Sequence, residues 1–167
     1  MIHVLGSINI DYAVTLSHLP SPGETITGHN LVLTPGGKGA NQALAASRAG
    51  ATVKMTGAVG TDSVADTAVS LLKEGGVDLS GVTEIPGPTG CAFVFVDEKS
   101  ENQIVIIAGA NGAVSTKHAR SMNIDRDNIL LLQLECPTDT VAAAANHAKQ
   151  QGAKTCLLYT SPSPRDS

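Results

Sequence analysis

The chain has 167 residues, of which 42% are hydrophobic and 16% charged, and its formal net charge is −4 at pH 7. This length fits one ordinary domain with its own hydrophobic core. A net negative charge with two Phe, two Tyr and no Trp argues against nucleic acid as a partner, because phosphate binding needs a basic face and base stacking needs aromatic rings. No segment has the roughly 20 apolar residues of a membrane helix, and the N-terminus lacks the pattern of a secretory signal, so we expect no membrane partner and a cytoplasmic location.

Short apolar runs and amphipathic segments alternate along the chain. In order, we expect strands at 2–5, 12–16 and 25–33, a helix at about 40–49, a strand at 52–59, a helix at about 63–74, strands at 91–96 and 103–108, a short helix at 115–122, a strand at 129–134, a helix at 138–150 and a strand at 155–159. Four of the strands are continuous apolar runs, which are typical of a parallel sheet buried on both faces. The pattern predicts a doubly wound, mostly parallel α/β sheet in a Rossmann-like, three-layer fold.

Two β-rich inserts, at about 12–36 and 89–109, do not fit this alternation. Their strands are apolar on both faces, so one face could cover a cleft while the other would need a partner. We interpret the inserts as a small β lid that can also pair with a second copy of the chain.

The C-terminal end departs from the pattern. Residues 1–158 fit an α/β domain, whereas residues 159–167 have no apolar period and contain two prolines, which a central strand does not accept. We expect a truncated α/β domain that is followed by a non-native or disordered tail.

The segment LTPGGKGANQALAASRAGA, residues 33–51, places three glycines, a lysine and an asparagine at the start of a helix. A nucleotide phosphate loop needs a Ser or Thr after its lysine, and the dinucleotide fingerprint needs a third glycine where Gln42 stands. The segment matches neither motif. Unpaired N–H groups at the helix start, with the side chains of Lys38 and Asn41, are suited to the hydroxyls of a sugar. A tight turn with a solvated lysine is the alternative.

Acidic and amide side chains follow two of the core strands. Asn9 and Asp11 come just after the first strand, and Glu135 follows the strand at 129–134. Open α/β sheets bind ligands at the carboxyl ends of their strands. One carboxylate can accept charge-assisted hydrogen bonds from two adjacent hydroxyls. We therefore expect these residues to meet the glycine segment at one edge of the sheet, although each alone could equally be a loop or capping residue.

Seven segments together resemble the ribokinase-like (PfkB) family of carbohydrate kinases. In chain order they are VLGSINID, LPSPGETITG, GGKGANQALAA, GAVGTDS, PTGCAFVFV, AGAN and LLLQLECP. They span about residues 2–158, which corresponds to about half of a complete family member. The combination of GGKGAN with NID is more similar to the ribose-specific branch than to the nucleoside or phosphofructose branches.

The resemblance implies ATP-dependent phosphorylation of the primary hydroxyl of D-ribose, with Mg²⁺ and a monovalent cation (K⁺), in a homodimer paired through the lid. The implied sugar contacts are Asn9, Asp11, Gly37, Lys38, Gly39, Ala40, Asn41 and Glu135. In this family the general base, the anion hole, the nucleotide pocket and the cation site belong to the C-terminal half. The resemblance thus implies a sugar-side half-site without catalysis.

Two alternatives stay open at this point. The chain could be a non-catalytic module for sugar binding or lid pairing. It could also belong to a kinase of the same family that acts on another sugar or on a nucleoside.

Overall fold

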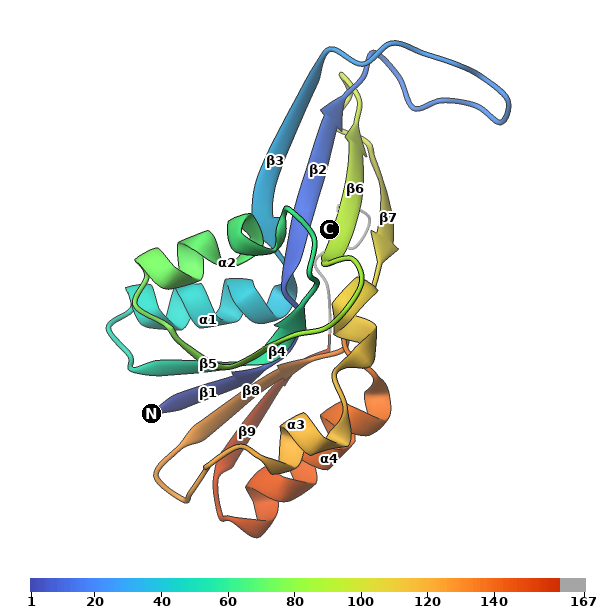
Figure 1. The fold of residues 1–167 in the computed structure, drawn as a ribbon. Coiled ribbons are helices and arrows are strands. Elements are labelled where there is room, and N and C mark those ends of the chain that lie inside the picture. Colours follow the sequence, from blue (N-terminus) through green and yellow to red (C-terminus); the bar gives the residue numbers. More distant parts are fainter. Residues whose placement is uncertain (160–167) are drawn as a thin grey trace.

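The computed structural model describes residues 1–159, and its largest element is a sheet of five parallel strands in the order β5-β4-β1-β8-β9 (Figure 1). The strands are β1 (Ile2–Leu5), β4 (Val53–Val59), β5 (Asp78–Glu84), β8 (Ile129–Gln133) and β9 (Lys154–Leu158). In β1, Val4 and Leu5 are both fully buried but belong to different hydrophobic clusters, because successive residues of a strand point to opposite faces. The sheet is therefore covered on both sides.

Helices lie on both faces of this main sheet. Helices α1 (Lys38–Arg48) and α2 (Ala65–Glu74) cover one face, and α3 (Thr116–Arg120) and α4 (Thr138–Gln150) cover the other (Figure 1). The doubly wound, three-layer architecture predicted from the sequence is confirmed. No helix within residues 1–159 is both long enough and apolar enough to span a membrane.

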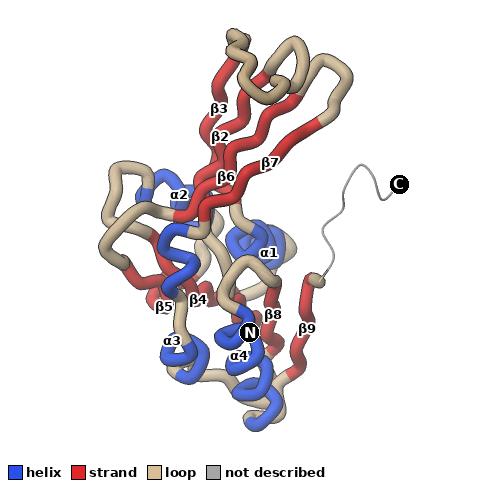
Figure 2. Tube along the Cα trace, turned by 90° about the vertical axis from the view of Figure 1, so that its right-hand side faces the viewer, coloured by secondary structure: helices blue, strands red, loops and turns tan. Residues whose placement is uncertain are grey.

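The two β-rich inserts form a second, four-stranded sheet that projects from the body (Figure 2). Its order is β3-β2-β6-β7, with β2 (Asn9–Thr15), β3 (Asn30–Gly36), β6 (Gly90–Val96) and β7 (Asn102–Ile107). Pairing is antiparallel within each insert, and β2 and β6 join the inserts in parallel. We call this element the small sheet. Its existence is confirmed, and its role as a lid stays a prediction.

Several local predictions were wrong. The main sheet has a fifth strand, β5, which the sequence did not reveal because an edge strand with the sequence DLSGVTE has no apolar run. The small sheet begins at Asn9, so Asn9 and Asp11 lie within β2 and not in a loop after β1. A 3₁₀ helix, η1 (Gly109–Ala113), follows β7 and was not expected. The expected tail lies outside the described residues, apart from Tyr159.

His3 is a buried polar side chain in the middle of the main sheet. It is 2% exposed. Its Nε2 lies 2.8 Å from Asn128 Oδ1, and its buried Nδ1 has no partner among residues 1–159. Nε2 must carry the proton to donate to Asn128, which leaves Nδ1 unprotonated. Burial lowers the pKa of His3 below its ordinary value, although the bond to Asn128 opposes that shift.

This lowered pKa predicts a loss of stability on acidification. Above the ordinary histidine value of 6.5, His3 is neutral in both the folded and the unfolded chain. As the pH falls below that value, the unfolded chain takes up the proton more readily, so the free energy of unfolding decreases. We expect the stability of His3→Gln to fall less than that of the unmodified chain between pH 7.5 and 5.5, as measured by chemical denaturation. The matched control is His29→Gln, which changes an exposed histidine. Equal pH dependence in the unmodified chain and the two variants would contradict the prediction.

Candidate functional site

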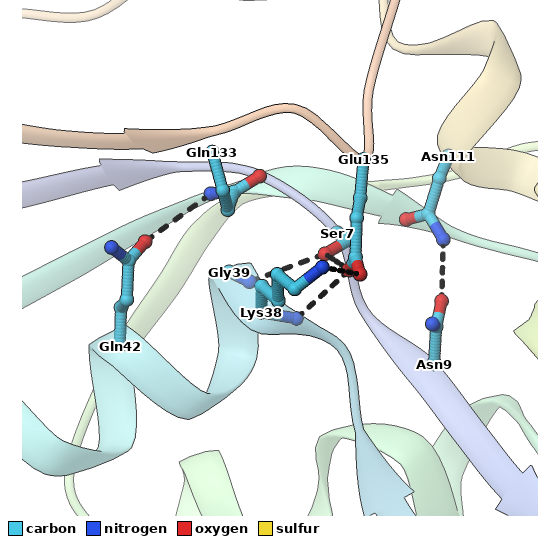
Figure 3. Close-up of polar contacts among 8 residues, drawn as sticks. All are labelled: Ser7, Asn9, Lys38, Gly39, Gln42, Asn111, Gln133 and Glu135. Carbon is cyan, nitrogen blue, oxygen red and sulfur yellow. Dashed lines mark hydrogen bonds and ion pairs between the residues drawn. The ribbon is translucent and has the colours of Figure 1, made fainter. Parts of the chain in front are cut away.

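The site lies at the carboxyl ends of β1 and β8, where the main sheet meets the small sheet. The two strands are parallel neighbours, with Leu5 opposite Leu132. Each is followed by a polar residue, and Ser7 Oγ donates to Glu135 Oε2 over 2.7 Å (Figure 3). The predicted convergence of Glu135 with the first strand at one sheet edge is confirmed.

The glycine segment lets the start of α1 lie directly against the backbone of Ser7. Gly37 has a φ of 90°, which disfavours any residue with a side chain. A Cβ on Gly39 would fall 2.6 Å from Ser7 N, which is closer than atoms can approach. The glycines therefore serve a close backbone contact within the protein.

The first N–H groups of α1 are already bonded, so the expectation of unpaired donors was wrong. Lys38 N donates to Glu135 Oε2 over 3.0 Å, and Gly39 N donates to Ser7 Oγ over 3.2 Å (Figure 3). Ala40 N donates to the carbonyl oxygen of Ser7 over 2.9 Å, and Asn41 N donates to that of Gly37 over 2.9 Å. Distant residues thus cap this helix, and a carboxylate occupies the place that a phosphate would take at a helix N-terminus.

Glu135 is the centre of this network. Its Oε1 lies 3.0 Å from Lys38 Nζ, and its side chain is 15% exposed. Burial alone would raise the pKa of Glu135, but the hydrogen bonds from Lys38 N and Ser7, together with the Lys38 ammonium, hold it below its ordinary value. Glu135 is therefore ionised and already bonded through both oxygens.

The pKa of Asp11 is shifted in the opposite direction. It lies in β2 opposite Thr34, with its carboxylate beside Gly36. Its Oδ1 is buried and has no hydrogen-bond partner among residues 1–159. Burial raises the pKa of Asp11, and the negative charge of Glu135 raises it further. A buried carboxylate oxygen without a partner is costly unless a ligand donates to it.

Asn9 lies two residues before Asp11, on the same face of β2. Its side chain is 4% exposed, and its Oδ1 accepts from Asn111 Nδ2 over 2.7 Å. In Figure 3 the NH₂ end of Asn9 turns away from Asn111. An amide and a carboxylate therefore belong to the same face of β2.

The structure brings some of the predicted site residues into direct contact and places others apart from them. Lys38, Gly39 and Glu135 are in direct contact, and Asn9 and Asp11 share a strand face next to them. Ala40 is buried at the start of α1, whereas Asn41 is exposed and lies beside Pro35 and α2 in a small cavity.

Three polar residues of the site region were not identified from the sequence. Ser7, Gln133 and Asn111 all lie within segments that resemble the family, but no pattern indicated what they contact. Gln133 is fully buried and donates to the carbonyl oxygen of Leu5 over 2.9 Å.

Comparison with known proteins gives a consistent result. A model of the pfkB family of carbohydrate kinases matches residues 1–167. The chain is 41% identical to the ribokinase of Haemophilus influenzae, a match that covers 92% of this chain and 51% of that protein. It is 40% identical to the ribokinase of Schizosaccharomyces pombe, covering 89% of this chain and 50% of that protein.

A solved structure shares the fold. The Arabidopsis thaliana ribokinase complexed with ribose and ATP matches with a TM-score of 0.80 and 30% identity, over 93% of this chain and 52% of that one. The chain spans about half the length of the relatives it matches. With a family match along its whole length and this shared fold, the chain belongs to the pfkB family of carbohydrate kinases.

Proposed function

We propose that the chain forms the sugar-binding half-site of an ATP-dependent kinase that converts D-ribose to D-ribose 5-phosphate. The observation that carries this proposal is the buried Oδ1 of Asp11, which has no hydrogen-bond partner among residues 1–159, at the junction of the two sheets. A sugar with adjacent hydroxyls supplies the donors that this oxygen lacks, and Asn9 offers a donor beside it.

The charges around the junction favour a neutral polyol over an anion. Asp11 and Glu135 are close enough for the charge of one to raise the pKa of the other. The nearby ammonium of Lys38 is already paired with Glu135. A phosphate at this place would face two carboxylates with no free helix N–H groups to receive it.

The eight implied sugar contacts divide into three roles in this proposal. Asn9 and Asp11 bind the sugar through their side chains, and Lys38 and Glu135 form one rim of the site. The backbone of Gly37, Gly39 and Ala40, with Asn41, shapes the turn against which the sugar rests.

The small sheet is proposed as the lid over this site. Asn9 and Asp11 lie in β2, so the sheet is continuous with the sugar-binding residues. Closing it over the sugar would exclude water, which competes as phosphoryl acceptor. Side chains on both faces of β7 are exposed, including Ile104, Val105, Ile106 and Ile107. We propose that a second copy of the chain covers the outer apolar face in a homodimer.

The described residues do not fit the nucleotide and ion sites. Residues 1–159 contain no group of three or more His, Cys, Asp or Glu side chains that could hold a metal ion. The N-terminus of α1, where a phosphate could bind, is occupied by the carboxylate of Glu135. We therefore propose that ATP, Mg²⁺ and K⁺ bind to parts of a complete kinase outside these residues, and that the kinase acts in the cytoplasm.

Removing the carboxylate of Asp11 should weaken sugar binding. If Asp11 accepts from two hydroxyls, Asp11→Ala should cost about 2–3 kcal/mol of D-ribose binding free energy. Isothermal titration calorimetry on the purified chain measures this change. Asp127→Ala, which alters an exposed aspartate at the opposite end of β8, is the control. Unchanged affinity in Asp11→Ala would show that the sugar binds elsewhere.

Acid should release the sugar at an unusually high pH. The proposed interaction needs ionised Asp11, whose pKa is raised above the ordinary value of 3.8. As the pH falls toward this raised pKa, the carboxylate takes up a proton and affinity is lost, while Glu135 stays ionised because its pKa is lowered. At neutral pH we expect Asp11→Asn to bind ribose more weakly than the unmodified chain does. From neutral pH down to the raised pKa of Asp11, the affinity of this variant should be nearly independent of pH. The same acid dependence in Asp11→Asn would assign the titration to another group.

Catalysis should require more than these residues. We expect no ribose-dependent formation of ADP from ATP by the 167-residue chain, because its described residues cannot stabilise the transferred phosphate.

Sequencing of the coding DNA beyond codon 158 should reveal an open reading frame with a glycine-rich segment followed by Asp. The extended protein should phosphorylate ribose faster than fructose or adenosine. A genuine stop codon there would favour a sugar-binding module instead.

A further inference from the structure

Asn111 is a buried side chain that touches the candidate site from η1. This 3₁₀ helix carries the chain from β7 of the small sheet back to the body (Figure 1). Asn111 is 2% exposed and lies against the segment that joins β1 to β2, more than 100 residues earlier in the chain. It therefore links the passage from β1 to β2 with the passage from β7 back to the body.

The backbone of Ile8 fixes the orientation of the Asn111 carboxamide. Its Oδ1 accepts from Ile8 N over 2.9 Å, and its Nδ2 donates to the carbonyl oxygen of Ile8 over 3.2 Å. An N–H can only donate and a carbonyl oxygen can only accept, so rotation of the carboxamide by 180° would break both bonds. Nδ2 is thus held in place, because the N–H of Ile8 can serve only as a donor and its carbonyl oxygen only as an acceptor.

This fixed orientation decides how Asn9 is turned. The second N–H of Asn111 Nδ2 donates to Asn9 Oδ1 over 2.7 Å (Figure 3). Because Asn9 must present its oxygen to this donor, its NH₂ group must face the other way. Gly90 packs against the pair, and a Cβ there would overlap the Asn111 amide and Asn9 Oδ1. The contact therefore leaves no space for a side chain at position 90.

We infer that Asn111 is a positioning residue that holds the Asn9 NH₂ group toward the sugar. The site then offers a fixed donor from Asn9 beside the acceptor of Asp11, on one face of β2. A sugar hydroxyl can accept a hydrogen bond from the NH₂ group of Asn9 and donate one to the carboxylate of Asp11. Two adjacent hydroxyls of a polyol can also share these two bonds. The ligand in this inference rests on the proposed function, whereas the orientation of Asn9 does not.

The main test is Asn111→Asp, which keeps the acceptor for Ile8 N and puts an oxygen in place of the nitrogen that donates to Asn9 and to the carbonyl oxygen of Ile8. Asn9 should then rotate to donate to the new carboxylate and present its oxygen to the sugar. We expect the dissociation constant for D-ribose to rise about tenfold or more. In an Asn9→Ala background, measured at higher ribose concentrations, Asn111→Asp should change affinity by less than about twofold. An equal loss in both backgrounds would overturn the inference, because it would indicate a purely structural effect.

A second variant separates positioning from folding. Thr140→Val removes a buried hydroxyl that donates to the carbonyl oxygen of Val114 over 2.9 Å, just beyond η1 and away from Asn9. It should lower the melting temperature and leave the ribose affinity unchanged. If Thr140→Val weakened ribose binding as much as Asn111→Asp does, loss of local stability would explain both results and the inference would fail.

The orientation of Asn9 can also be measured without any sugar. In ¹⁵N-labelled chain, the Asn9 side-chain NH₂ protons should show no nuclear Overhauser effect to Asn111 in the unmodified protein. In Asn111→Asp, the same protons should show one to residue 111. If no ribose binds but this reversal occurs, the proposed function fails while the positioning role holds. An Asn9 amide that keeps its orientation in Asn111→Asp would overturn the inference, whether or not ribose binds.

Discussion

The site depends on one interaction, the capping of α1 by the carboxylate of Glu135. This group accepts from Ser7 after β1 and from the backbone of Lys38 at the helix start, and it pairs with the Lys38 ammonium. A negative charge at a helix N-terminus is stabilised by the aligned peptide dipoles. The interaction therefore ties β1, α1 and β8 together at the sheet edge. It also fills the place where a phosphate would bind.

The neighbouring carboxylates of Glu135 and Asp11 differ in their hydrogen bonding and in the direction of their pKa shifts. Glu135 has bonding partners for both oxygens, and its pKa is lowered, so it acts within the protein. Asp11 has a buried oxygen without a partner among residues 1–159 and a raised pKa, so it is the group that we propose binds a ligand. Burial and hydrogen bonding, not residue type, make this distinction. The same reasoning separates Asn111, bonded on every side, from the NH₂ of Asn9.

Much of the architecture could be predicted because it follows from local patterns. Apolar runs such as ILLLQ in β8 are typical of a mostly buried strand, and the helices show the spacing of an apolar face. The edge strand β5 could not be predicted, because it is only partly buried and carries no such run. The strand position of Asn9 and Asp11 could not be predicted, because the pairing of β2 with β3 and β6 is a long-range property.

The sequence by itself determined the alternation of strands and helices, the glycines at the start of α1 and the set of polar residue types near the sheet edge. Only the tertiary structure decided which of those groups remain free for a ligand. The partners concerned lie far apart in the chain: 97 residues separate Lys38 from Glu135, and 102 separate Asn9 from Asn111. A hydrogen-bonding group is available or occupied according to what lies within about 3 Å of it, and local sequence does not specify that neighbour.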